Sequence, residues 1–359
     1  MDAIVRGLVA SGVLVMGCMM TSAVAQAVGA GQIAREASTL ARVRAAGVLG
    51  CGIDREEPEY STADDHGGRE AFDQDLCRAV AVAVLGEHAR VRVVEYPDDR
   101  AAMEALKAGA VDMVPTLSDD FTHSVGTHLE FTRPVLWDGV GFLVLGSSPA
   151  MRARQLSGKK ICFIAETAVE ESVRTWFARE QLDFVPFPFQ EEGEMEAAFA
   201  TGNCGALAGD RTRLAGTRAL LEQHGRTARL LREVISKDPL AAAVRDDDPQ
   251  WASIVCWVME ALVQAEESGV TQANVESMHA AVGKANGVDP VLWFLLGGSH
   301  QMGSALGLAD DWVVLVIKAH GNYGEMYERD LGSGSRLKLP RGENDLREHG
   351  GLMIALPPK

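Results

Sequence analysis

The sequence is short of positive charge. Lysine and arginine together number 34 against 50 aspartates and glutamates, so the formal net charge is 34 minus 50, or −16. A negative field of this size repels nucleic acid and anionic membrane surfaces. The charge balance therefore argues against polyanion binding, and we expect no nucleic-acid partner.

Metal-ligand spacings and phosphate-binding glycines are also missing. The chain has no CxxC pair, and its nine histidines are scattered. His123 and His128 are five residues apart and are interpreted as unrelated loop histidines. The glycine-rich stretch at 332–336 does not lead into a helix with the lysine of a phosphate-binding loop. We expect neither a metal nor a cofactor.

The N-terminal segment lacks a run long enough to span a membrane. It has Arg6 near its start, an apolar run over 7–20 and then the small residues AVA. This pattern is typical of a secretory signal peptide. We therefore expect 1–25 to direct export. Two alternatives stay open, because Cys18 could carry a lipid anchor and the segment could instead form a buried helix.

Apolar residues are plentiful and make up 47% of the 359 residues. That is enough for two ordinary domains with cores of their own. Strand-like and helical stretches alternate over 72–116, and the alternation starts again at Lys159 and continues to residue 235. The pattern predicts two α/β lobes, each an open, mostly parallel sheet flanked by helices.

No flexible linker separates the two alternating regions. An apolar strand lies between them, so the simplest topology lets the chain cross into lobe 2 near residue 145 and return near residue 240. Lobe 2 then comprises 145–240, and lobe 1 comprises 39–144 and 241–359, with a C-terminal helical extension. Two crossings make a two-stranded hinge. A ligand is expected in the cleft between the lobes, at the carboxyl ends of the strands.

Export would place the cysteines in an oxidising compartment, where disulfides persist. Two local bridges, Cys51 with Cys77 and Cys162 with Cys204, are the economical pairing. Four cysteines permit three connectivities, so the sequence alone leaves the pairing open. Cys256 is left over in an apolar helical stretch, and we expect a packed thiol there rather than a nucleophile.

Several stretches spread over the chain carry a family resemblance. They are TLARVRAAGVLGCGI, LEFTRPVLWDGVGFLV, ISKDPLAAAVRDDDPQW and the long tail that begins GNYGEMYERD. Together they resemble the periplasmic solute-binding proteins of amino-acid ABC transporters, closest to the general L-amino-acid binding group. Short relatives end soon after the helix similar to YGEMYER, so the tail favours that group. Paired cysteines at similar places in the family support the two local bridges.

The resemblance implies a fold, a location and a function. The fold is the α/β, two-lobed type II periplasmic-binding-protein fold with a two-stranded hinge. The function is that of a periplasmic receptor, expected to act as a monomer, which binds an amino acid or a related amine and delivers it to the permease of an ABC importer. Such a receptor needs no catalytic group and no cofactor.

The family pocket needs an aromatic or apolar wall, a cation for the α-carboxylate and a carboxylate for the α-ammonium. The wall position matches Tyr60, and the ammonium-binding aspartate matches Asp210, which ends a strand and starts a helix. Taken without the resemblance, Tyr60 could be a solvent-facing loop residue and Asp210 could be a helix N-cap.

The carboxylate clamp departs from the family pattern. Relatives usually carry an arginine after a threonine-rich turn, because a guanidinium binds a planar carboxylate through two parallel hydrogen bonds. The matching stretch, VPTLSDDFTHSVGTHLEF, contains no arginine; Asp119 takes its place and Asp120 adds a further negative charge. Arg133 follows, but in the family its position usually faces away from the pocket. Hydroxyls remain available from Thr116, Ser118 and Thr122.

A second departure follows the strand-like stretch ICFIA. Relatives have a glycine and a threonine there, whose backbone N–H groups and hydroxyl hold the substrate carboxylate. This chain has Glu166 and Thr167. Both departures disfavour a bound α-carboxylate, so we expect a pocket retuned to a cationic or amine-bearing solute. The alternative is that Glu166 faces solvent or pairs with Lys159 or Lys160.

Two other functions remain open at this stage. Some relatives on this fold are periplasmic dehydratases of cyclohexadienyl acids, and Glu166 could act as a general acid if burial raised its pKa. Those substrates are carboxylates, however, so the missing arginine argues against an enzyme. The other possibility is a sensory or partner-binding protein with a degenerate solute site.

Overall fold

The computed structural model describes residues 38–54, 69–282 and 289–358. The expected signal peptide, Cys18 and Tyr60 lie outside these ranges. The strands are β1 Leu49–Asp54, β2 Val91–Tyr96, β3 Val114–Ser118, β4 Leu129–Asp138, β5 Val140–Leu145, β6 Lys160–Ile164, β7 Val185–Phe189, β8 Ala206–Asp210, β9 Ala228–Leu230 and β10 Asp238–Arg245.

The helices alternate with these strands and then dominate the C-terminal part. They are α2 Thr39–Ala46, α3 Arg69–Leu85, α4 Asp99–Lys107, α5 Phe121–Ser124, α6 Ala168–Arg179, α7 Glu192–Ala200, α8 Arg211–Gln223, α9 Pro249–Glu267, α10 Val275–Val282, α11 Pro290–Leu295, α12 Gln301–Leu306, α13 Trp312–His320 and α14 Tyr323–Asp330. No helix in the described ranges is long and apolar enough to cross a membrane.

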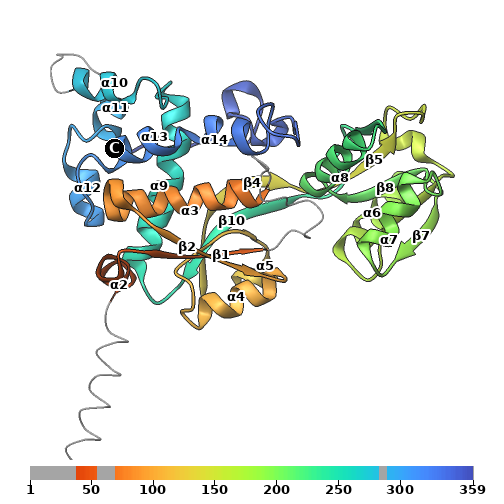
Figure 1. Ribbon diagram of the computed structural model, residues 1–359, viewed down its shortest axis with the longest axis horizontal. Coiled ribbons are helices and arrows are strands. Elements are labelled where there is room, and N and C mark those ends of the chain that lie inside the picture. The colour runs from red at the N-terminus through yellow and green to blue at the C-terminus, as the bar shows by residue number, and fades with distance from the viewer. Residues whose placement is uncertain (1–37, 55–68, 283–288, 359) are drawn as a thin grey trace, which may run out of the picture.

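The elements form two lobes. Lobe 1 holds the parallel pair β1–β2 and a three-stranded sheet in the order β3-β10-β4, whose strand pairs are antiparallel. Lobe 2 holds a five-stranded sheet in the order β7-β6-β8-β5-β9, in which β6 runs parallel to β7 and β8. Figure 1 shows the lobes side by side, joined through β4 and β10.

The first crossing lies earlier than expected. β5 pairs with β8 and β9, so the chain has already entered the lobe 2 sheet at Val140, and the boundary moves from residue 145 to Gly139. The return is made by β10, which begins at Asp238. An apolar run identifies a buried strand but carries no sign of which sheet it joins.

Gly139, between β4 and β5, is required by the close approach of the two crossing segments. Its φ is +151°, and a Cβ added there would lie 2.6 Å from the carbonyl oxygen of Ser236. Real Cβ atoms do not come so close to an oxygen, so only glycine fits. The backbones of the two crossing segments are therefore in direct contact at this point.

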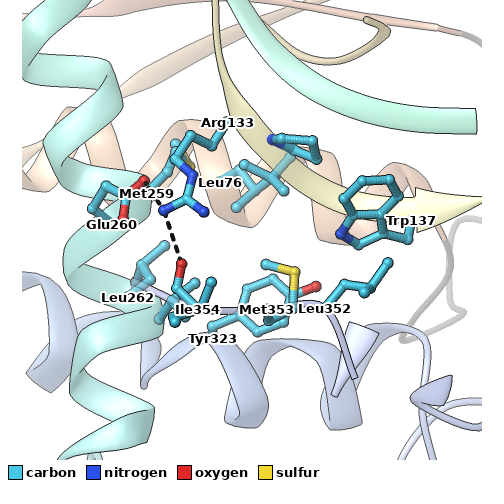
Figure 2. Close-up of a pocket in the computed structure, with 13 residues that line it drawn as sticks. Leu76, Arg133, Trp137, Met259, Glu260, Leu262, Tyr323, Leu352, Met353 and Ile354 are labelled. Carbon is cyan, nitrogen blue, oxygen red and sulfur yellow. Dashed lines mark hydrogen bonds and ion pairs between the residues drawn. The ribbon is translucent and has the colours of Figure 1, made fainter. Parts of the chain in front are cut away.

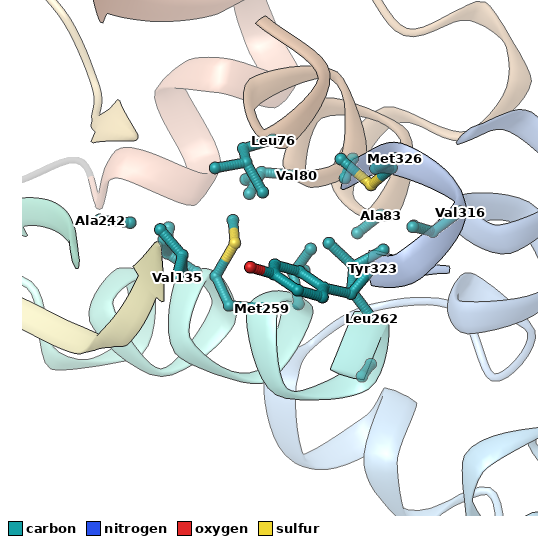
Figure 3. Close-up of a cluster of buried hydrophobic side chains, with 14 of the residues drawn as sticks. Leu76, Val80, Ala83, Val135, Ala242, Met259, Leu262, Val316, Tyr323 and Met326 are labelled. Carbon is teal, nitrogen blue, oxygen red and sulfur yellow. The ribbon is translucent and has the colours of Figure 1, made fainter. Parts of the chain in front are cut away.

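The lobe 1 core gathers helices from both ends of the chain. Leu76 and Val80 of α3 pack with Met259 and Leu262 of α9 and with Tyr323 of α14, as Figure 3 shows. The helices α3 and α9 are buried at consecutive positions, 79–84 and 258–265, so they are covered on all sides and lie at the centre of the lobe. The C-terminal helices are thus part of lobe 1 and not a separate unit.

Both expected disulfides are present. Cys51–Cys77 joins β1 to α3, and Cys162–Cys204 joins β6 to the turn before β8. Each closes a loop, of 26 and 42 residues respectively, and chain-entropy arguments assign about 3 to 4 kcal/mol to each. Cys256 is unpaired. Burial raises its pKa to about 11, in keeping with a packed thiol rather than a nucleophile.

A buried carboxyl pair links α3 to α14. Asp75 forms ion pairs with Arg78 and Arg329, and Asp330 is only 3% exposed. Burial, followed by the charge of Asp75, raises the pKa of Asp330 to about 7. Asp330 is therefore partly protonated at neutral pH.

We expect the stability of the protein to fall between about pH 4 and pH 7 because of Asp330. The folded state holds this proton up to about pH 7, whereas an unfolded aspartate releases it near 3.8. The folded state binds more protons in that window, so its advantage is lost as the pH rises. Asp330→Asn removes this step, and the fall in unfolding free energy from about pH 5 to about pH 8 should shrink by up to about 3 kcal/mol. Urea unfolding at a series of pH values measures this. If the unfolding free energy fell equally with pH in the parent protein and in Asp330→Asn, Asp330 would not be the group responsible.

Candidate functional site

The hinge brings strand ends of both lobes to one place. Asp138, the last residue of β4, lies opposite the first residue of β10. Ser118, at the end of β3, lies opposite a residue near the start of β10. Asp210, at the end of β8, lies opposite the first residue of β5. β6 runs beside β8 in the same direction, so the turn that contains Glu166 lies at the same edge of the lobe 2 sheet.

The three hydroxyls expected on the lobe 1 side differ in what they offer a ligand. Thr116 is buried, and its hydroxyl donates to Asp73 at 2.8 Å. Ser118 is half-buried at the end of β3, whereas Thr122 is exposed on α5. The Thr116 hydroxyl proton is thus engaged within lobe 1, and Ser118 and Thr122 lie nearer to solvent.

Two carboxylates follow β3. Asp119 donates its backbone N–H to Pro239 at 2.8 Å, and its carboxylate accepts a hydrogen bond from the Ser124 hydroxyl at 2.5 Å. Asp120 caps α5 by accepting the His123 backbone N–H at 2.9 Å. Burial opposes ionisation of Asp120, but the hydrogen bonds from His123 prevail and lower its pKa. Asp120 is therefore negatively charged at neutral pH.

The two loop histidines near this turn contact different carboxylates. His123 Nδ1 lies 2.9 Å from Asp120 Oδ2, and His128 Nδ1 lies 3.3 Å from Asp246 Oδ2. Within the described residues, no group of three or more histidine, cysteine, aspartate or glutamate side chains is arranged to hold a metal ion.

Glu166 sits in a turn that suits glycine. Its φ is +60°, in the left-handed region that glycine adopts without steric cost and other residues rarely adopt. This is a physical reason for the glycine that the resemblance places here. The Glu166 side chain is exposed, and in the described part of the chain no ion pair joins it to Lys159 or Lys160. Its carboxylate is therefore open to solvent in this structure.

The start of α6 uses the groups next to Glu166. The Thr167 hydroxyl donates to the carbonyl of Ile164 at 2.8 Å and accepts the N–H of Glu170 as the helix N-cap. Glu170 in turn accepts the Glu166 N–H at 2.9 Å. That bond, followed by one from Arg174, lowers the pKa of Glu170. The turn is thus fixed by its own residues, while the Glu166 side chain takes no part.

Asp138 caps α8 across the hinge, a role that the sequence did not reveal. Its carboxylate accepts the Arg211 N–H at 3.0 Å and the Thr212 hydroxyl at 2.6 Å, and the residue is 4% exposed. Asp210 occupies the N-cap position, but its side chain makes no capping bond. Asp210 is therefore the N-cap by position, while the side-chain capping bonds come from Asp138 of β4.

Arg133 does not replace the missing clamp arginine. Its guanidinium donates to the carbonyl of Ile354 at 3.0 Å and lies 3.6 Å from Glu260. Figure 2 shows this side chain directed towards α9 and the C-terminal segment. The expectation that Arg133 faces away from the pocket is confirmed.

Glycine at position 166 should stabilise the protein. Glu166→Gly is expected to raise the unfolding free energy by about 1 kcal/mol, because it removes the left-handed strain of a residue with a Cβ. Glu166→Gln keeps the Cβ and should leave stability within about 0.5 kcal/mol. Urea unfolding of the three proteins tests this, and a Gly variant less stable than the Gln variant would refute the strain argument.

The Asp138 cap should contribute more to the unfolding free energy than an exposed helix cap does. Asp138→Ala is expected to lower the unfolding free energy by about 2 kcal/mol or more, because the buried N–H groups at the start of α8 lose their acceptor. Asp120→Ala removes the exposed cap of the short helix α5 and should cost less than about 1 kcal/mol. Chemical denaturation measures both, and an equal loss would mean that burial of the Asp138 cap adds nothing.

Comparison with known proteins gives consistent similarities over most of the chain. No protein-family model matches it. It is 36% identical over 344 residues to the general L-amino acid-binding periplasmic protein AapJ of Rhizobium johnstonii, which covers 94% of this chain and 98% of the relative. It is 35% identical to the glutamate/glutamine/aspartate/asparagine-binding protein BztA of Rhodobacter capsulatus, with 90% and 94% covered.

A solved structure extends the comparison to the fold. An ABC transporter periplasmic binding protein from Brucella ovis, with glutathione bound, is 34% identical and superposes with a TM-score of 0.74. The superposition covers 90% of this chain and 100% of the Brucella chain. Both lobes and their connection therefore have a counterpart of known architecture.

Proposed function

Since the chain belongs to the periplasmic solute-binding proteins of amino-acid ABC transporters, we propose that it binds an amine-bearing solute in the cleft between its lobes and delivers it to a membrane permease. It acts in this proposal as a monomer. The named ligands of the relatives are amino acids and glutathione, all of which carry an ammonium group. They also all carry a carboxylate, so they support an amine-bearing solute in general, and the weaker binding of carboxylates is inferred from this chain's own strand-end residues.

The observation that carries the proposal is the grouping of carboxylates at the strand ends beside the hinge. Asp119 and Asp120 follow β3, Glu166 follows β6, and Asp210 ends β8. The stretch after β3 contains no arginine where relatives carry their clamp. A solute ammonium gains from such a site, whereas an α-carboxylate meets like charge.

The missing clamp arginine allows the selectivity between amines and amino acids to be estimated. Leaving a carboxylate without a cationic partner in a closed site costs several kcal/mol, and each step of about 1.4 kcal/mol is a factor of ten in affinity. Neutral amino acids should therefore bind at least about a hundredfold more weakly than amines without a carboxylate. Tyr60, the expected wall, takes the role of covering the apolar part of the solute in this proposal.

Binding to a solute panel tests the proposal. Protein refolded to remove any bound ligand is titrated calorimetrically with the common amino acids, glutathione, polyamines and other amines. Amines are expected to bind, and Glu166→Gln or Asp210→Asn should weaken them about tenfold, roughly the effect of one charge-assisted contact. Glutamine is preferred at 166 because glycine would also change the stability of the turn. Glu104→Gln, an exposed carboxylate on α4, is the matched control and should change nothing.

The other outcomes decide between the remaining functions. Tight binding of neutral amino acids would mean that another group replaces the clamp arginine and that the pocket is not retuned. No binding by any solute would favour a sensory or partner-binding protein. A dehydratase would need a general acid, but the exposed position of Glu166 supplies no burial to create one.

A further inference from the structure

The C-terminal segment after α14, residues 331–358, is called the tail below. It contacts lobe 1 at β4, an outer strand of the sheet β3-β10-β4. Asn344 is buried, and its side chain bonds both backbone groups of Trp137: the Trp137 N–H donates to Oδ1 at 2.6 Å, and Nδ2 donates to the Trp137 carbonyl at 2.8 Å. In the order β3-β10-β4, Trp137 is on one outer strand, whereas Asp119 and Asp120 of the candidate site follow the other.

The far end of the tail is fixed to lobe 1. Glu260 and Glu267 of α9 accept the backbone N–H groups of Leu356 and Ala355, at 2.5 and 3.2 Å. Burial raises the pKa of both carboxyls, and these N–H bonds act in the opposite direction. Arg133 holds the adjoining carbonyl, as Figure 2 shows. The tail is thus anchored at its end as well as at the hinge strand.

The middle of the tail reaches lobe 2. Arg218, on α8, donates to the backbone carbonyls of Leu337 and Lys338. Leu337 and Leu339 are buried in the apolar cluster that forms the lobe 1 core, and Ala215 of α8 belongs to the same cluster. Lys338 has a φ of +41°, a strained conformation for a residue with a Cβ, and such strain persists only where neighbouring contacts impose it. Figure 1 shows the tail region beside α8.

A second arginine of α8 lies near the same junction. Burial lowers the pKa of Arg211, while the charges of Asp138, Tyr327 and Glu343 act to raise it. Tyr327 and Glu343 belong to α14 and the tail, whereas Asp138 belongs to β4. The Arg211 guanidinium itself donates to the carbonyl of Leu231 in lobe 2, so Arg218 is the arginine of α8 whose guanidinium bonds the tail.

We propose that the tail is a strap across the outer edge of the hinge, and that Arg218 is a positioning residue which sets the balance between open and closed lobes without touching the solute. The crossing strand β10 lies between the strap and the candidate cleft. When the lobes close on the β3 side, their β4 sides must separate, so the Arg218 bonds are stretched or broken. Part of the solute's binding free energy then serves to release the strap.

The strength of the effect follows from the bonds that are lost. A hydrogen bond from a charged group shifts an equilibrium by about tenfold. Removal of the Arg218 side chain should therefore raise the closed population about three- to tenfold, and the apparent dissociation constant of a bound solute should fall by the same factor. The expected fall in the dissociation constant rests on the proposed function, whereas the expected rise in the closed population does not.

Interlobe distances measured without solute test the strap directly. Spin labels are placed at Glu104→Cys on α4 and Thr175→Cys on α6, both exposed positions, in the exported protein carrying Cys256→Ser. Double electron–electron resonance should show Arg218→Gln shifted to shorter distances, with Arg218→Lys between it and the parent protein. Thermal unfolding midpoints of these variants establish that the lobes themselves are intact.

A matched control is available within lobe 2. The Arg229 guanidinium also donates to two backbone carbonyls, those of Ser148 and Ala150, both at 3.0 Å, but all three residues belong to the same lobe. Arg229→Gln should leave the interlobe distances unchanged. Identical distributions for the parent protein, Arg218→Gln and Arg229→Gln would overturn the strap, as would a shift of Arg218→Gln to longer distances.

The two proposals fail separately. A distance shift in Arg218→Gln with no solute found in the panel would uphold the strap and count against the proposed solute. Solute binding with no distance shift and no gain in affinity would uphold the receptor and reject the strap. Where a solute is found, tighter binding of Arg218→Gln through slower dissociation completes the test.

Discussion

The carboxylate of Asp138 ties the start of α8 to the end of β4 at the point where the chain passes between the lobes. It belongs to the last residue of a lobe 1 strand, yet its acceptor oxygens receive the first N–H groups of α8 in lobe 2. An unsatisfied helix end buried beside a hinge would be costly. Gly139 then lets the crossing segments approach closely enough for this contact to form. The positions of Asp210 and of α8 both follow from that junction.

The electrostatics that we propose for the candidate cleft depart from the family pattern that the resemblance implies. Carboxylates end or follow strands from both lobes, and the arginine nearest in sequence, Arg133, is bound to the C-terminal segment. The proposal thus combines a family scaffold with a changed charge pattern at the strand ends. Only the residues at the strand ends need to change for this to happen, because the sheets and helices behind them supply the geometry. Family membership therefore fixes the architecture more firmly than the solute.

Local sequence patterns predicted the secondary structure and the division into lobes. They could not predict contacts between residues that are far apart in the sequence. Alternating periodicity was sufficient for the two α/β lobes, and cysteine spacing favoured the pairs that the structure contains. β5 was assigned to the wrong lobe because burial does not reveal a pairing partner. Asp138 was missed because it caps a helix 73 residues away, which leaves no local signature. The left-handed turn at Glu166 could be anticipated only through a resemblance that places glycine there.

Each disulfide lies within one lobe: Cys51–Cys77 belongs to the first, and Cys162–Cys204 to the second. Oxidation in the periplasm therefore stiffens two separate bodies, and among the described residues no covalent bond other than the main chain spans their junction. Motion of one lobe relative to the other then requires changes in only a few backbone torsion angles, around Gly139 and at the start of β10. The two bridges can therefore stiffen the lobes without restricting the motion of one lobe against the other.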